Sequence, residues 1–174
     1  MNLNHYIYNP KRVHCTGNGE DYNETVMKIY ETDAEPEVIE TLIAFSKDWE
    51  AEESCYGYRA NTREDIEGRR IFLAEKNGEV LGCLFGVITS SKRMRSIMPE
   101  DTPFFEAEEL YVIPKERSKG IGSALFHAAE EAVKDEAEYI VLSTATKNWK
   151  AVFHFYLEEL DMTFWSATLF KKIR

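Results

Sequence analysis

The 174-residue chain lacks several features that mark secreted, membrane-spanning and disulfide-stabilised proteins. Its three cysteines, Cys15, Cys55 and Cys83, are an odd number without Cys-x-x-Cys spacing, so we expect reduced thiols rather than a disulfide framework. No run of about 18 apolar residues occurs, and the first residues lack the charged and apolar regions of a signal peptide. These absences predict a cytoplasmic protein.

Positive charge is also scarce. Lys and Arg total 21 against 31 Asp and Glu, which gives a net charge of −10. This balance disfavours binding to nucleic acid or to an anionic membrane, because both need basic surface. It would suit a cationic, amine-bearing substrate, although acidic surface also serves solubility alone. The four histidines show no ligand spacing, so we expect no metal site.

Apolar periodicity predicts one mixed α/β domain over residues 24–174, preceded by an irregular extension over residues 1–23. The 44% hydrophobic content suits a single domain with a full core. Alternating strands and helices favour a sheet with helices on its faces. The expected strands are 25–30, 71–75, 80–88, 104–113, 139–142 and 162–173, and the expected helices are 36–52, a short one within 53–66, 121–132 and 148–160. Asn77-Gly78 predicts a hairpin turn, and residues 89–103 a long loop.

The most informative stretch is residues 110–124, where an apolar strand runs through a short basic loop into an amphipathic helix. Gly120 and Gly122 let a phosphate approach backbone N–H groups, and the helix N-terminus adds partial positive charge. Arg117 and Lys119 add full charges. The dinucleotide fingerprint fails because leucine replaces its third glycine, and no Gly-Lys-Ser/Thr follows. These residues predict a loop that binds a pyrophosphate; the alternative is that they form an ordinary turn between a strand and a helix, without a ligand.

The pattern Arg117-x-x-Gly120-x-Gly122 resembles the acetyl-CoA loop of the GNAT superfamily of N-acetyltransferases. The element order over roughly residues 24–173 is similar as well. The resemblance implies a GNAT-like acyl-CoA N-acyltransferase fold, α/β with a mixed, mostly antiparallel central sheet flanked by helices, and acetyl-CoA as co-substrate. The cofactor-binding residues it implies are Leu110, Tyr111, Val112, Arg117, Ser118, Lys119, Gly120, Ile121, Gly122, Ser123 and Asn148.

The same resemblance offers Tyr156 as a catalytic acid. It stands in a segment similar to Phe-Tyr-x-x-x-Gly-Phe, whose tyrosine is often proposed to protonate the departing thiolate. Family members place this tyrosine seven residues after an asparagine equivalent to Asn148. Tyr156 lies eight residues after it, and Phe155 occupies the expected position. A one-residue bulge in the helix would restore Tyr156; without one, Tyr156 is an ordinary helix residue.

The candidate base is Glu108. Because side chains alternate along a strand, Glu106 and Glu108 should share one face and Glu109 the other. Several families keep a carboxylate near the Glu108 position, and others keep one where this chain has Ser143. The glutamates could equally form solvated surface, and Asn148 could be a plain helix N-cap.

These residues predict an N-acetyltransferase that moves the acetyl group of acetyl-CoA directly to a primary amine of a small molecule or peptide. Residues 45–66 and 89–105 are expected to select the acceptor, which the sequence does not identify. Two alternatives remain: a catalytically silent acyl-CoA-binding regulatory module, and a protein-interaction module that docks a partner through its 89–103 loop. A homodimer is compatible with each.

Overall fold

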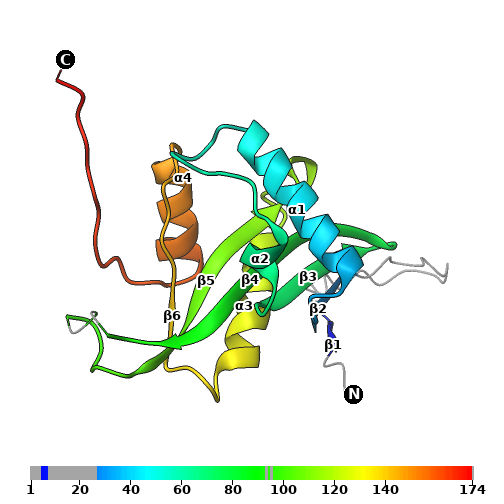
Figure 1. Ribbon diagram of the computed structural model, residues 1–174, viewed down its shortest axis with the longest axis horizontal. Helices are drawn as coiled ribbons and strands as arrows, with labels where there is room; N and C mark the ends of the chain where they lie inside the picture. The colour runs from blue at the N-terminus through cyan, green and yellow to red at the C-terminus, as the bar shows by residue number, and fades with distance from the viewer. Residues whose placement is uncertain (1–4, 8–26, 93, 95, 174) are drawn as a thin grey trace, which may run out of the picture.

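The computed structural model describes residues 5–7, 27–92, 94 and 96–173. At its centre is a six-stranded sheet whose strands lie in chain order from β1 to β6 (Figure 1). All neighbouring strands are antiparallel except β5 and β6, which are parallel. The strands are β1 (His5–Ile7), β2 (Lys28–Thr32), β3 (Arg70–Lys76), β4 (Glu79–Ser90), β5 (Pro103–Val112) and β6 (Tyr139–Val141). The predicted mixed, mostly antiparallel sheet is confirmed.

Helices cover both faces of this sheet, with α1 on one face and α3 on the other (Figure 1). Alternate residues of β3 divide between the two cores: Ile71 and Leu73 face α1, whereas Phe72 and Ala74 face α3. The helical elements are α1 (Pro36–Ala51), α2 (Arg63–Ile66), the 3₁₀ turn η1 (Pro114–Glu116), α3 (Ile121–Val133), α4 (Trp149–Phe153) and its π-helical continuation η2 (His154–Glu159).

The elements with strong local signals match their predictions. α1 begins at Pro36, whose fixed φ suits the first turn of a helix, and it buries its apolar stripe. Asn77 and Gly78 both have positive φ, as a tight hairpin turn requires, and they join β3 to β4.

Three predicted segments differ from the structure. Residues 162–173, expected as a strand, form none, because no described strand lies beside them to accept their backbone hydrogen bonds. The irregular extension over 1–23 is wrong for His5–Ile7, which pair with β2; residues 1–4 and 8–23 lie outside the described part of the chain. The strand expected at 25–30 is β2, which the structure gives as Lys28–Thr32; residues 25 and 26 lie outside the described part of the chain.

The longest strand pair, β4 with β5, contains a β-bulge. Phe85 pairs with Glu109 and the next residue, Gly86, pairs with Ala107, so Glu108 is an extra residue on β5. Gly86 is required here because a Cβ atom at this position would lie 2.1 Å from the backbone oxygen of the residue preceding Ala107.

Candidate functional site

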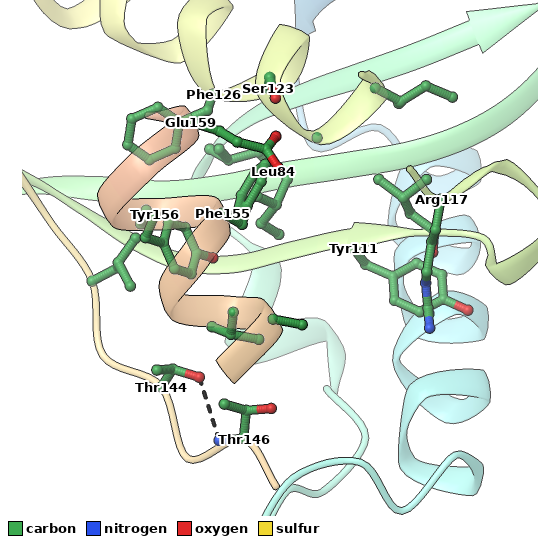
Figure 2. Close-up of a pocket in the computed structure, with 18 of the residues that line it drawn as sticks. Leu84, Tyr111, Arg117, Ser123, Phe126, Thr144, Thr146, Phe155, Tyr156 and Glu159 are labelled. Atoms are coloured by element: carbon green, nitrogen blue, oxygen red, sulfur yellow. Dashed lines mark hydrogen bonds between the residues drawn. The ribbon is translucent and has the colours of Figure 1, made fainter. Parts of the chain in front are cut away.

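A cavity of about 600 Å³ opens where β5 and β6 diverge. β6 pairs only with Phe104–Glu106 of β5, so among the described residues no strand lies beside the rest of β5 on that side. The walls come from β5, the start of α3, residues 142–148 and the α4–η2 helix (Figure 2). One edge of a strand and one helix N-terminus therefore meet in the same space.

Nearly all of the predicted site residues line this cavity. Lys119 does not: its ammonium group pairs with a carboxylate oxygen of Glu116 at 3.1 Å. Those that do are Glu108, Leu110, Tyr111, Val112, Arg117, Ser118, Gly120, Ile121, Gly122, Ser123, Asn148 and Tyr156.

The N-terminus of α3 has the geometry of an anion cradle. Gly120 adopts a left-handed conformation with φ of 80°, and no side chain caps the helix. The N–H of Ala124 donates a hydrogen bond to the backbone oxygen of Gly120 at 3.0 Å. The N–H groups of Ile121, Gly122 and Ser123 precede it and have no partner within the helix. They border the cavity, so the residues present fit a pyrophosphate.

The Arg117 side chain ties this loop to the end of α1. Its guanidinium donates to both carboxylate oxygens of Glu52, at 2.6 and 2.8 Å, and to the backbone oxygen of Val112 at 2.7 Å. The hydrogen bonds to Glu52 raise the pKa of Arg117. Both cations expected to meet a phosphate, Arg117 and Lys119, are therefore paired with carboxylates, and the backbone N–H groups are the donors left for an anion.

The helix that carries Tyr156 contains an irregular, π-helical segment. Residues 154–159 are π-helical, and the N–H of Leu160 donates to the oxygen of Phe155, five residues back, at 3.1 Å. Phe155 and Tyr156 both line the cavity, and the Tyr156 hydroxyl points into it (Figure 2). Burial, with a smaller effect from Cys55, raises the pKa of Tyr156 to about 12, so the phenol stays protonated at neutral pH.

Glu108 lies at the cavity as the bulge residue of β5. Its carboxylate accepts a hydrogen bond from Arg69 Nε at 2.5 Å, and both side chains are partly exposed. The bulge also changes the predicted alternation of side chains. Ala107 belongs to the core under α3, but Glu109, two residues later, lies on the α1 side of the sheet with Tyr58. The expectation that Glu109 faces away from Glu106 is therefore wrong, because Glu108 interrupts the period of two.

Glu109 is a buried carboxylate that the sequence analysis did not single out. Only 6% of the residue is exposed. Its Oε2 accepts hydrogen bonds from the Tyr58 hydroxyl at 2.8 Å and from Asn61 Nδ2 at 2.7 Å, and its Oε1 has no partner among the described residues. Burial raises the pKa of Glu109, and the two hydrogen bonds oppose this change. Glu109 thus holds the loop between α1 and α2 against the sheet.

That loop forms a wall of the cavity which no sequence pattern indicated. Cys55 forms an isolated antiparallel bridge with Thr146, and the N–H of Tyr56 donates to Ala145 at 2.9 Å. Ser54 and Cys55 of this loop line the cavity, as does Trp49 near the end of α1. None of the described residues of 89–105 lines it.

Other site types find no support in the described residues. No group of three or more His, Cys, Asp and Glu side chains there could hold a metal ion. No helix in that part of the chain is both long and apolar enough to cross a membrane. Cys55 and Cys83 are free thiols, and Cys15 lies outside the described residues.

Comparison with known families agrees with the geometry of this site. The model of the acetyltransferase (GNAT) family matches residues 27–162. The chain belongs to the GNAT acetyltransferase family. This family uses acetyl-CoA.

Several solved structures share the fold of this GNAT protein at low sequence identity. An aminoglycoside acetyltransferase from an uncultured soil metagenomic sample is 17% identical, with a TM-score of 0.63 over 85% of this chain and 99% of its own. An aminoglycoside N-acetyltransferase in complex with CoA is 15% identical, with a TM-score of 0.64 over 88% and 98%. A predicted acetyltransferase from Clostridium acetobutylicum with acetyl-CoA is 14% identical, with a TM-score of 0.59 over 84% and 96%. No curated protein sequence matches the chain.

Proposed function

We propose that this GNAT protein is a cytoplasmic N-acetyltransferase that moves the acetyl group of acetyl-CoA directly to a primary amine of a small molecule or peptide. The supporting observation is the meeting of three groups in one cavity: the uncapped N-terminus of α3, the open edge of β5 and the buried phenol of Tyr156. The free thiols of Cys55 and Cys83 suit a reducing compartment.

Binding rests on backbone groups. The N–H groups of Ile121, Gly122 and Ser123 would hold the pyrophosphate, and the open edge of β5 would pair with the pantetheine amides. Acetyl-CoA supplies a thioester, whose acyl carbon exchanges its bond to sulfur for a bond to the amine nitrogen. These donors are already in place, so binding requires little reorganisation of the chain.

Two side chains would manage the protons. Tyr156 holds a proton on its hydroxyl inside the cavity and would donate it to the thiolate that leaves. Glu108 would accept the proton that the ammonium group loses, and Arg69 would orient that carboxylate. A silent acyl-CoA-binding module would need the cradle alone, and a buried proton donor facing the same cavity favours chemistry over that alternative.

The acceptor is proposed to be a cationic small amine. The net charge of −10 attracts cations toward the protein, and two of the structural neighbours are described as aminoglycoside acetyltransferases. Aminoglycosides carry several amines, so they belong in the first acceptor panel beside polyamines, amino acids and peptides.

The test is an assay of free-thiol release from acetyl-CoA over that acceptor panel, with mass spectrometry of the products. Amine-dependent thiol release with a product heavier by one acetyl group supports the proposal. Binding of acetyl-CoA without thiol release would favour the silent module, and a folded protein that does not bind acetyl-CoA would contradict both.

A graded pair of variants tests the cradle through acetyl-CoA affinity. Gly122→Val should weaken acetyl-CoA binding by about tenfold or more in calorimetry, because its side chain blocks the approach of an anion to the helix N-terminus. A Cβ atom at Gly122 would also lie 3.2 Å from the Phe155 ring. Gly122→Ala should therefore have a smaller effect of the same sign. Unchanged affinity in a folded Gly122→Val protein would rule the cradle out.

A further inference from the structure

Glu109 is the only buried carboxylate among the described residues, and one of its two oxygens is unused. Its Oε2 accepts two hydrogen bonds, whereas its Oε1 has no partner in that part of the chain. A buried polar atom without a partner costs stability, and an apolar group of the same shape is often no less stable in such a place. Packing alone therefore does not explain Glu109, and its two hydrogen bonds point to a further role.

Both donors to Glu109 belong to residues 52–62, the loop that joins α1 to α2. The Tyr58 hydroxyl donates at 2.8 Å and Asn61 Nδ2 at 2.7 Å, so β5 contacts the second half of this loop at two points. A third point lies on α1, because the N–H of Asn61 donates to Ser46 Oγ at 2.9 Å. Residues 57–62 form neither helix nor strand, so side chains hold this half of the loop in place.

The first half of the same loop forms the cavity wall. Ser54 and Cys55 line the cavity. Backbone hydrogen bonds join this half to the chain that follows β6: the N–H of Tyr56 donates to Ala145 at 2.9 Å, and the N–H of Lys147 donates to Ser54 at 2.8 Å. The loop therefore connects β5, through Glu109, with the segment that follows β6, and it does so beside the cavity.

Trp49, near the end of α1, links the two halves of the loop. Its ring packs against the Tyr58 ring with the centroids 4.6 Å apart, and its Nε1 donates to Ser54 Oγ at 2.9 Å. Trp49 itself lines the cavity. A displacement of Tyr58 would therefore reach the cavity wall through one ring contact and one hydrogen bond.

This wall lies away from the anion cradle. In Figure 2, Ser123 at the start of α3 and Thr146 lie toward opposite ends of the view, with Tyr156 between them. Cys55 of the loop pairs with Thr146, so the loop belongs to the Thr146 end. With a pyrophosphate at the cradle and the reacting sulfur beside Tyr156, the acceptor would approach from the end that the loop forms.

We propose that Glu109 is a positioning residue for the amine acceptor: it fixes Tyr58, and through Trp49 it sets the place of Ser54 in the cavity wall. Glu109 does not line the cavity, whereas the adjacent Glu108 does, so Glu109 acts through the loop and not on the substrate. The inference rests on the proposed function for the identity of the reaction. The link from Glu109 to the wall is a structural claim that can be tested without the reaction.

Tyr58→Phe tests the link because it removes the hydroxyl that Glu109 holds and keeps the ring against Trp49. The KM for the best amine of the acceptor panel should rise by about fivefold or more, and kcat should change less. Acetyl-CoA affinity in calorimetry should stay within about twofold of the parent value. Tyr30→Phe is the matched control: Tyr30 donates to Glu75 at 2.9 Å, and neither residue lines the cavity, so both constants should stay at parent values.

Two variants of Glu109 separate its oxygen from its charge. Glu109→Gln retains an oxygen that can accept from Tyr58, so the acceptor KM should remain close to that of the parent. Glu109→Leu removes the oxygen and should raise the acceptor KM as Tyr58→Phe does. The double variant Tyr58→Phe with Glu109→Leu should be no worse than the poorer single variant, because both changes remove the same hydrogen bond. If Glu109→Leu does not fold, Tyr58→Phe and Glu109→Gln still decide the question.

Amide hydrogen exchange measures the link without any acetyl transfer. The amides of Tyr56 and Lys147, which join the loop to the chain after β6, should exchange several-fold faster in Tyr58→Phe and at the parent rate in Tyr30→Phe. Unchanged exchange in a folded Tyr58→Phe protein would overturn the proposal. So would an unchanged acceptor KM, or a Glu109→Gln protein as impaired as Tyr58→Phe. A parent that acetylates no amine contradicts the proposed function instead, and the exchange rates still decide whether Glu109 fixes the wall.

Discussion

At the scale of single residues, Tyr156 lies within the π-helical segment η2, and its side chain lines the cavity. Replacing Tyr156 with Phe keeps the ring and removes the proton donor. We expect kcat to fall by about 10²–10⁴-fold while acetyl-CoA affinity changes little. Steady-state kinetics and calorimetry together measure the two effects.

A control for this prediction exchanges the two neighbouring rings. The double variant Phe155→Tyr with Tyr156→Phe retains one phenol on the same turn but moves it by one residue. If the position of the hydroxyl decides catalysis, the exchanged protein should be as slow as Tyr156→Phe. Parent-like turnover in Tyr156→Phe would show that Tyr156 only packs in the helix.

The buried carboxyl of Glu109, another single residue, should make the stability of the protein depend on pH. Its pKa is raised in the folded protein by burial, so the folded state holds the proton more tightly than the unfolded state does. The stability associated with this proton is fully present below the ordinary carboxyl pKa, and it is lost as pH rises through the raised value. Glu109→Gln removes this dependence and retains an oxygen for Tyr58 and Asn61.

Denaturant unfolding measured from about pH 4 to pH 8 checks this prediction. The free energy of unfolding of the parent should decline relative to the variant as pH rises, by at most about 1.4 kcal/mol per pH unit for one proton. Glu106→Gln, an exposed glutamate of the same strand, is the matched control and should not change the slope. Parallel pH profiles for the parent and Glu109→Gln would contradict the assignment.

At the scale of elements, the β4–β5 bulge depends on the close approach of the two backbones at Gly86. Gly86→Ala should destabilise the protein by about 1–3 kcal/mol, because the new Cβ atom meets the backbone oxygen of Glu106, which cannot turn aside as a side chain can. Gly122→Ala is the control, since its Cβ atom meets only the movable ring of Phe155. Equal loss of stability in both variants would show that the bulge is not so constrained.

The predictable elements were those whose signals are local. The α1 helix, the turn at Asn77-Gly78 and the loop around Gly120 follow from periodicity, turn chemistry and the needs of a phosphate. The bulge at Glu108 and the hydrogen bonds of Glu109 depend on register between distant strands and on a loop without pattern. Sequence spacing left open whether the helix has a bulge near Tyr156, and only the structure shows that η2 is π-helical.

Residues 162–173 show the opposite situation: their sequence favours a strand, but no described strand lies beside them. A strand is formed by hydrogen bonds to a neighbour, and no neighbour is present within the described chain. Local propensity therefore cannot determine the structure of this segment by itself.

At the scale of the whole molecule, the sheet consists of two unequal parts. β1 to β5 are joined by antiparallel pairs, whereas among the described residues β6 pairs with β5 only through Phe104–Glu106. An isolated bridge between Cys55 and Thr146 joins the loop after α1 to the loop after β6. The cradle and the Tyr156 phenol both face the opening between these parts. The proposed function thus depends on the cavity that forms where β5 and β6 separate.

The short junction between β5 and β6 also has a consequence for how the protein opens. Regions held by few contacts unfold locally at a lower free energy than the rest of a domain, so β6 and α4 should exchange their amide hydrogens earlier than β2 to β5. A substrate bound between β5 and β6 touches both parts and adds its binding energy to their association. While it is bound, the substrate would act as a temporary strand of the enzyme, and each round of product release would loosen the sheet again.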